Sequence, residues 1–186
     1  MTSFFCRSFV LVCLLAASGS ALSDTPREAR RPFPLQGEVV QVMDGDTVGL
    51  RIGRRNETIR LASIDAPETG KPGRPGQPYS QASRRALENL VRGKAVIAHC
   101  YEVDAYDRNI CDIRLADGTN VNEAQVRAGM AWANREGRDK FLRDKRLPQV
   151  EHQARAQGRG LWADRDPMSP WQWRYTCWRQ HQCNGQ

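Results

Sequence analysis

The chain has 186 residues, which is enough for one domain of ordinary size with a real core. Its composition, with 40% apolar and 26% charged residues, is that of a soluble globular protein and excludes a chain without a hydrophobic core. The 28 Lys and Arg residues outnumber the 21 Asp and Glu residues, giving a formal charge of +7, which indicates an anionic partner.

The N-terminal segment, residues 1–23, is typical of a secretory signal. Arg7 precedes an apolar run of nine residues, and small residues follow up to a predicted cut after Ser23 or Ala21. The run is well short of the roughly 18 residues that a spanning helix needs, which disfavours a membrane anchor. The bulky residue before Cys13 disfavours lipoprotein processing. We therefore expect a periplasmic or secreted protein that has no membrane contact after signal removal.

Four cysteines remain once the signal is removed, and the mature charge becomes +6 because only Arg7 is lost among the ionised residues. An even number of cysteines in an exported protein favours two disulfides among Cys100, Cys111, Cys177 and Cys183. A zinc site is the weaker interpretation, since the chain has no Cys-x-x-Cys pair and His99 beside Cys100 is an isolated match.

The first strands are predicted after a flexible basic leader at residues 24–36. From Gly37 onward, apolar residues alternate with polar ones around an Asp-Gly turn, which is the pattern of two half-buried strands in a hairpin. A third strand should follow and end at Pro67. The apolar positions that carry this prediction are Val40 and Val42, then Val48, Leu50 and Ile52, then Ile59 and Leu61.

A loop and a helix are predicted next. Residues 70–78 contain three prolines and three glycines, the composition of a loop. Its charges, Lys71 and Arg74, suit a flap near an anionic ligand, although a plain exposed connector is an equal alternative. Ser80 is predicted to cap a helix that carries an apolar stripe and stops at Gly93.

Two more strands are predicted at residues 96–100 and 110–115. If they pair as a hairpin centred between Ala105 and Tyr106, Cys100 stands directly opposite Cys111, within the span of a disulfide. Two further helices are expected after this hairpin, at Asn122–Trp132 and Pro148–Gln157.

This order of elements predicts an α+β, mainly β fold: a five-stranded OB-fold barrel with three helices, spanning residues 37–165. Residues 166–186 form a short C-terminal tail with Cys177 and Cys183. Its aromatic residues alternate with Arg174 and Arg179, so one interpretation is a surface that binds nucleic-acid bases. The other is that the tail packs on the barrel and is stapled by a Cys177–Cys183 disulfide.

Candidate functional residues fall in three clusters around these strands. Carboxylates in the first two clusters suit a hard divalent cation, and arginines in the last two suit a phosphate. The glutamate of the second cluster could orient or deprotonate an attacking water. Each cluster also has a simpler explanation, as a hairpin turn, a surface ion pair and a solvated hairpin tip. The clusters are Asp44-Gly45-Asp46-Thr47; Arg60, Asp65 and Glu68; and Asp104, Tyr106 and Arg108.

These clusters make the chain resemble the thermonuclease family, the staphylococcal-nuclease-like phosphodiesterases. The resemblance covers residues 37–162 and implies an OB-fold barrel with three helices. It further implies a calcium-dependent enzyme that hydrolyses DNA and RNA to products ending in a 3′-phosphate. Its motifs are Asp44-Gly45-Asp46-Thr47-Val48, the run Ile59 to Thr69, Asp104-Ala105-Tyr106-Asp107-Arg108, Val121-Asn122-Glu123-Ala124 with Val126-Arg127 and Gly129, and Gly158-Arg159-Gly160-Leu161-Trp162.

The resemblance also implies the role of each site residue. Metal ligands would be Asp46, Asp65 and the backbone carbonyl of Ala66, with Asp44 beside the metal. Calcium is the expected ion, and magnesium or manganese are alternatives. The phosphate would be held by Arg60 and Arg108, the water would be activated by Glu68, and Tyr106 and Asp104 would contact the substrate.

Four positions depart from the family pattern. Ala66 stands where threonine is common, and Asp107 replaces the usual glycine between the tyrosine and the arginine. Ala105 replaces a lysine that assists phosphate binding in the best-known member, and Arg135 stands near the position where that member has a substrate-stacking tyrosine.

We expect a monomer that acts on single-stranded or frayed DNA and RNA. The alternatives are a non-cleaving OB-fold module that binds nucleic acid, and an exported cation-binding or interaction protein with a decayed site.

Overall fold

The computed structural model describes residues 32–183. The predicted signal segment and the leader up to residue 31 lie outside the described residues. Among the helices in the described range, none has both the length and the apolar character needed to cross a membrane.

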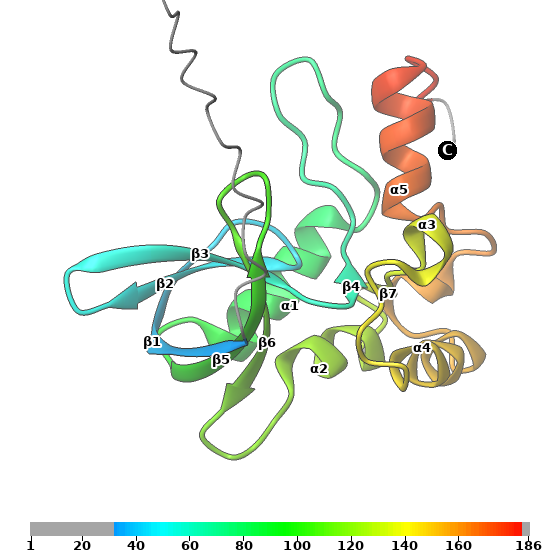
Figure 1. Ribbon diagram of the computed structural model, residues 1–186. Coiled ribbons are helices and arrows are strands. Elements are labelled where there is room, and N and C mark those ends of the chain that lie inside the picture. Colours follow the sequence, from blue (N-terminus) through cyan, green and yellow to red (C-terminus); the bar gives the residue numbers. More distant parts are fainter. Residues whose placement is uncertain (1–31, 184–186) are drawn as a thin grey trace, which may run out of the picture.

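Five strands close into a barrel in the order β1-β2-β3-β6-β5 (Figure 1). Neighbouring strands run antiparallel, except that β3 and β6 are parallel. Apolar side chains alternate into the barrel and form its core, as the sequence pattern predicts. The strands are β1 (Phe33–Val42), β2 (Thr47–Ile52), β3 (Arg55–Leu61), β5 (Ala95–Val103) and β6 (Asn109–Leu115).

The first strand begins earlier than the sequence pattern predicts. Phe33 already pairs with Cys100 of β5, four residues before the predicted start at Gly37. Phe33 and Leu35 pack against the core and alternate with more exposed neighbours, so the strand pattern extends into the basic segment. The predicted leader therefore ends too late. Its prolines and arginines are typical of a flexible segment, although Phe33 and Leu35 pack against the core.

The β5–β6 hairpin confirms one predicted disulfide. Cys100 pairs with Cys111 across the strands, and their sulfur atoms are bonded. The register shifts by one residue between Cys100 and Glu102, so Val103 faces Asn109 nearer the tip. Both predicted disulfides are present, and the alternative of zinc bound to these cysteines is therefore wrong.

Three larger helices pack beside the barrel, as predicted: α1 (Ser80–Val91), α2 (Val121–Arg127) and α4 (Leu147–Ala156). Ser80 is not a cap, because Tyr79 precedes the helix in a left-handed conformation with φ 66°. Helix α2 ends five residues earlier than predicted, since Gly129 takes a positive φ of 67° just after it.

The residues freed from α2 form a small second sheet that supports the functional site. Here β7 (Trp132–Ala133) pairs with β4 (Ile64–Asp65), so that Asp65 lies opposite Trp132. A short helix, α3 (Glu136–Asp139), follows β7.

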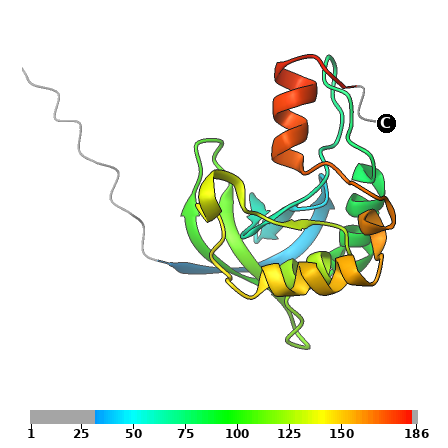
Figure 2. The same ribbon diagram turned by 90° about the vertical axis from the view of Figure 1, so that its right-hand side faces the viewer.

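The C-terminal extension is helical and stands beside the loop between β4 and α1 (Figures 1 and 2). After the turn η1 (Gly160–Ala163), it consists of α5 (Pro170–Trp173) and the wider helical turn η2 (Arg174–Arg179). The indole nitrogens of Trp173 and Trp178 both donate to the carbonyl of Pro75, at 3.4 and 2.9 Å. The extension is stapled by its disulfide as predicted, but these contacts go to the loop at residues 70–78 rather than to the barrel.

Candidate functional site

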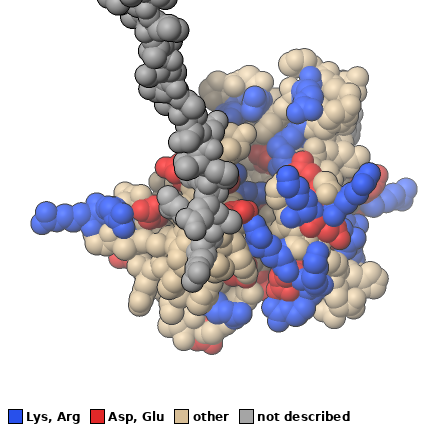
Figure 3. Space-filling model, viewed as in Figure 1, with Lys and Arg blue, Asp and Glu red and all other residues tan. Residues whose placement is uncertain are grey.

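A cleft of about 1020 Å³ lies between the barrel, the β5–β6 tip, the β4–α1 loop and the C-terminal extension. Basic side chains surround a hollow on this side of the molecule, with acidic ones inside it (Figure 3). Seven acidic and seven basic residues line the cleft: Asp44, Asp46, Asp65, Glu68, Glu102, Asp104 and Glu136, with Arg60, Lys71, Arg74, Arg108, Arg143, Arg174 and Arg179.

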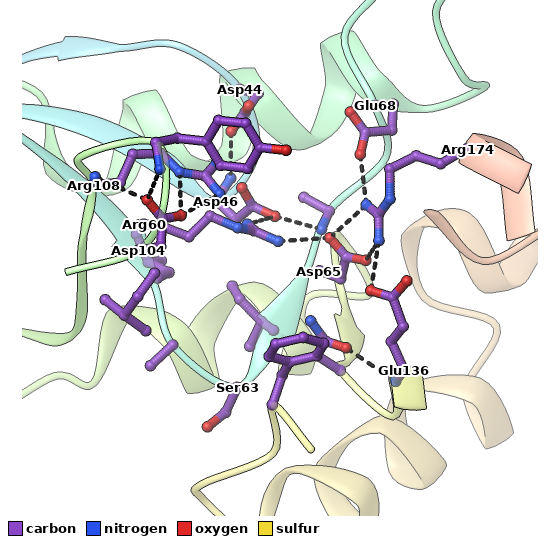
Figure 4. A pocket seen from close by; sticks show the side chains of 18 of the residues that line it. Asp44, Asp46, Arg60, Ser63, Asp65, Glu68, Asp104, Arg108, Glu136 and Arg174 are labelled. Carbon is purple, nitrogen blue, oxygen red and sulfur yellow. Dashed lines mark hydrogen bonds and ion pairs between the residues drawn. The ribbon is translucent and has the colours of Figure 1, made fainter. Parts of the chain in front are cut away.

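The floor of the cleft is an arginine held between two buried carboxylates (Figure 4). Arg60 Nη2 lies 2.7 Å from Asp65 Oδ1, and its Nη1 forms an ion pair with Asp46. The side chains of Asp46 and Asp65 are only 5% and 1% exposed. Strand alternation produces this arrangement, since the neighbours of Arg60 on β3 point into the core. Arg60 therefore forms ion pairs with buried carboxylates, and the simpler explanation of a surface ion pair is wrong.

The Asp44–Asp46 turn is fixed by close packing at Gly45. A β-carbon at this glycine would lie 1.8 Å from Ser83 Oγ of α1 and 2.7 Å from the β-carbon of Ala66. The side chain of Gln125 on α2 also donates to the carbonyl of Gly45 at 2.7 Å. Two helices thus hold the turn in place, and only glycine fits at its centre.

Crowded negative charge shifts the protonation of these groups. Burial and the nearby carboxylate of Asp46 raise the pKa of Asp44 to about 8. Burial also disfavours the charged form of Asp46, but Arg60 outweighs it and lowers the pKa of Asp46. Asp46 and Asp65 hold the pKa of Arg60 above its ordinary value despite its burial. The floor is thus short of positive charge.

The residues on the floor fit a hard divalent cation. Asp46 and Asp65 both contact the single guanidinium of Arg60, so their oxygens converge on one region of the cleft. Calcium prefers carboxylate and carbonyl oxygens and takes its remaining ligands from water or substrate, so Asp46, Asp65 and the Ala66 carbonyl suit it. No group of three His, Cys, Asp or Glu side chains in residues 32–183 is arranged as a complete cation site.

Glu68 and Arg108 approach the floor from opposite sides (Figure 4). Glu68 follows β4, and its burial raises the pKa of its carboxyl although a neighbouring arginine opposes this. Arg108 comes from the β5–β6 tip and is 30% exposed. Its Nε donates to Asp104 Oδ2 at 2.8 Å, while the other oxygen of Asp104 accepts the backbone N–H of Tyr106 and Arg108. In this structure Asp104 therefore orients Arg108.

The remaining predicted residues are placed around this centre. Tyr106 is 81% exposed, and the Arg108 guanidinium lies 5.4 Å from the centroid of its ring. Ala105 also lines the cleft. Arg135 does not line the cleft, whereas its neighbour Glu136 does.

Asp107 is accommodated by the turn that presents Arg108. It takes a left-handed conformation with φ 61°, the region in which the expected glycine would sit without strain. The turn nevertheless closes, since Asp107 N–H donates to the Asp104 carbonyl at 3.2 Å and Asp104 N–H donates to the Arg108 carbonyl at 2.9 Å. The departure from the family pattern leaves Arg108 in the cleft.

The strain at Asp107 gives a testable prediction. We expect Asp107→Gly to stabilise the protein by about 0.5 kcal/mol, which raises the Tm by about 1 to 2 °C. The matched variant Asp107→Ala should be the least stable of the three, because alanine lacks the tolerance of aspartate for positive φ. Thermal unfolding followed by circular dichroism measures both changes. A Tm for the alanine variant equal to that of the glycine variant would contradict the strain.

Arg174 is a site residue that lies outside the three clusters predicted from the sequence. Its guanidinium reaches the floor from the C-terminal extension and contacts Asp65, Glu68 and Glu136. In the sequence it lies 106 residues from Glu68, in a tail whose aromatics suggested base stacking. One signal in the sequence could have indicated a further arginine at the site: the three clusters contain more carboxylates than arginines.

Comparison with known proteins gives a consistent result. The family model described as "Staphylococcal nuclease homologue" matches residues 58–164. An "Uncharacterized endonuclease" of Escherichia coli O157:H7 is 40% identical over 141 residues, covering 76% of this chain and 86% of that protein. A "Micrococcal nuclease" of Shigella flexneri is 36% identical over 148 residues, covering 75% and 80%. "Protein ParB" of Escherichia coli is 32% identical over 177 residues, covering 90% and 93%. The chain belongs to the family of staphylococcal nuclease homologues and is a nuclease.

Proposed function

We propose that this nuclease is an exported enzyme that uses calcium to hydrolyse phosphodiester bonds in both DNA and RNA. The observation that carries the proposal is the floor of the cleft, where Arg60 lies between the buried carboxylates of Asp46 and Asp65. A phosphodiester needs both a cation and hydrogen-bond donors on its non-bridging oxygens as charge accumulates. On this floor the two candidate cation ligands, Asp46 and Asp65, directly contact the candidate phosphate-binding side chain of Arg60.

In the proposed reaction Asp46, Asp65 and the Ala66 carbonyl would hold calcium, which would supply positive charge to polarise the phosphodiester. Arg60 and Arg108 bind the non-bridging oxygens from the floor and from the hairpin tip. Glu68 orients a water and accepts its proton as the water oxygen attacks phosphorus. The bond from phosphorus to the 5′-oxygen breaks, the leaving oxygen takes up a proton, and the product ends in a 3′-phosphate.

Two features support the finer parts of the proposal. The groups assigned to catalysis act on phosphate, which DNA and RNA share, so the same site suits both polymers. Two disulfides in the described chain fit an oxidising compartment, together with the predicted signal at residues 1–23. The proposed enzyme acts as a monomer on single-stranded or frayed substrate, because all the groups assigned to catalysis line one cleft of a single chain.

The proposal is tested by digestion of single-stranded DNA and of RNA with the purified mature chain. We expect cleavage of both polymers with calcium, none with a chelator, and fragments that a 3′-phosphatase can process. Magnesium and manganese should be tried in parallel. A chain that leaves both polymers intact with every one of these ions but retains them on a filter would instead support the non-cleaving binding module.

The charged rim of the cleft predicts a salt-dependent affinity for polynucleotide. Lys71, Arg74 and Arg179 are exposed beside the cleft, where they can contact phosphates on either side of the cut. In chelator, each phosphate contact to single strands should contribute about −0.7 to the slope of log K against log salt concentration. Lys71→Gln with Arg74→Gln should therefore reduce the slope by about 1.4 in filter-binding titrations.

The matched control for the salt experiment is Arg54→Gln. Arg54 is an exposed cation at the β2–β3 turn, remote from the loop in Figure 1, and does not line the cleft. Its replacement should leave the slope unchanged. A slope that is flat in the unaltered chain, or reduced equally by the control, would show that the rim does not contact the backbone.

A further inference from the structure

We propose that Arg174 is a positioning residue of this nuclease, through which the C-terminal extension holds Glu68 and Asp65 in the orientation that hydrolysis requires. The inference rests on the proposed roles of Glu68 and Asp65. It assigns a function to the extension, which lies beyond residues 58–164, the part matched by the family model.

The Arg174 guanidinium contacts three carboxylates from three different segments (Figure 4). Its Nη1 lies 2.6 Å from Glu68 Oε1 and 3.2 Å from Asp65 Oδ1. Its Nη2 lies 2.9 Å from Asp65 Oδ2 and 3.0 Å from Glu136 Oε2. Each terminal nitrogen thus faces two carboxylates, and we infer that Arg174 acts through them rather than on a substrate phosphate.

Glu68 is held at both its backbone and its side chain by the same assembly. The side-chain oxygen of Gln77 accepts the Glu68 N–H at 3.1 Å, and the Gln77 N–H donates to the Glu68 carbonyl at 2.9 Å. The side-chain nitrogen of Gln77 donates at 2.6 Å to the carbonyl of Met168, at the base of the extension. The extension therefore fixes the Glu68 backbone through Gln77 and its carboxylate through Arg174.

The extension is itself anchored well enough to act as a rigid support. Trp173 and Cys177 are buried, on either side of Arg174 in the sequence. Trp178 donates to Pro75 at 2.9 Å and carries the Arg74 guanidinium 5.3 Å from its ring centroid. The disulfide from Cys177 to Cys183 closes the end of the helix. Arg174 is thus presented from a packed helical turn rather than from a free tail.

Charge explains why a cation is needed at this point. In the described structure Arg174 is the cation paired with Glu68, whereas Asp65 is also paired with Arg60. Without Arg174, the carboxylates of Asp65, Glu68 and Glu136 would face one another with no positive charge between them. Repulsion would turn Glu68 away from the floor, where it must reach the attacking water.

The test compares steady-state kinetics on single-stranded DNA with calcium for Arg174→Gln, Arg174→Lys and Arg165→Gln. Removing a side chain that orients catalytic carboxylates typically costs about 10- to 100-fold, so we expect this loss in kcat for Arg174→Gln with KM within about twofold. Lysine restores the positive charge but not the planar pair of donor nitrogens of the guanidinium, and should recover part of kcat. Arg165 is exposed, near the base of the extension, and has no ion pair in the described structure, so its variant should match the wild type.

Several outcomes would overturn the inference. An unchanged kcat for Arg174→Gln would do so, as would a raised KM with unchanged kcat, which is the result expected of a substrate-binding arginine. An equal loss in Arg165→Gln would show an effect of bulk charge alone. If Arg174→Gln does not fold, the lysine variant decides by the same criteria.

A second measurement separates this inference from the proposed function. In calcium-free protein, melting temperatures are compared for Arg174→Gln, Glu68→Gln and the double variant. If the two side chains are coupled, the loss in the double variant is smaller than the sum of the single losses. Strictly additive losses would refute the coupling whether or not the wild type cleaves nucleic acid. A wild type that does not cleave overturns the proposed function alone.

Discussion

Replacing Arg60 with lysine is expected to lower kcat/KM about 1000-fold, by analogy with arginines that act at other phosphoryl-transfer sites. Arg60 forms ion pairs with Asp46 and Asp65 at once and is only 15% exposed. A lysine keeps one positive charge between these carboxylates, but it cannot contact both and also donate in parallel to a phosphate. The loss is therefore expected mainly in transition-state stabilisation, measured by initial rates on single-stranded DNA with calcium.

Lysine is preferred over alanine because folding must survive the change. Removing the charge altogether would leave the buried carboxylate of Asp46 unpaired and Asp65 paired with Arg174 alone, at a cost of about 3 to 5 kcal/mol. Arg51→Lys is the matched control. It makes the same exchange in the neighbouring strand β2, at an exposed ion pair with Glu38, and should leave the rate unchanged. A rate for Arg60→Lys within about tenfold of the wild type, at unchanged Tm, would remove Arg60 from the phosphate-binding role.

Glu68→Gln is expected to lower kcat by a factor of about 10² to 10⁴, the contribution of a positioned general base. The amide has nearly the same shape as the carboxylate and can still accept a hydrogen bond from Arg174, but it cannot take a proton from water. KM should change little if Glu68 does not contact the phosphate. Single-turnover cleavage with saturating calcium measures the effect directly.

Glu88→Gln provides the comparison for this variant. Glu88 lies on α1, pairs with Arg84 and Arg92 at the surface, and does not line the cleft. Its replacement removes a carboxylate without touching the site, so the rate should stay at the wild-type value. Equal rates for Glu68→Gln and wild type would mean that another group activates the water. A rate of zero in both would favour the non-cleaving binding module.

Much of the barrel was predictable because the alternation of apolar and polar residues along each strand is a local feature of the sequence. Alternation at positions such as Val48, Leu50 and Ile59 sets which side chains enter the core, and these three are fully buried. The symmetry of the β5–β6 hairpin placed Cys100 opposite Cys111. Its bulge near the tip leaves that pair unchanged and was not predictable from the spacing.

The errors arose where tertiary contacts decide the local structure. Residues up to Trp132 have a helical pattern, yet Gly129 ends α2 early because the backbone of Arg159 packs against it; a β-carbon there would lie 2.1 Å from the Arg159 carbonyl oxygen. Trp132 then pairs with Asp65 in a two-residue strand too short to show a period. Arg174 could not be placed, since no local pattern connects a C-terminal arginine with a carboxylate 106 residues earlier.

The close packing at Gly45 bears on any attempt to re-engineer the proposed ion preference of this enzyme. Selectivity among divalent ions depends on cavity size and on the freedom of the ligands to adjust. Because the turn is pressed against Ser83 and Ala66, the carboxylate of Asp46 has little room to move outward. Enlarging the proposed ion cavity would therefore begin on the buried face of α1, with a smaller residue at Ser83, and not with the proposed acidic ligands.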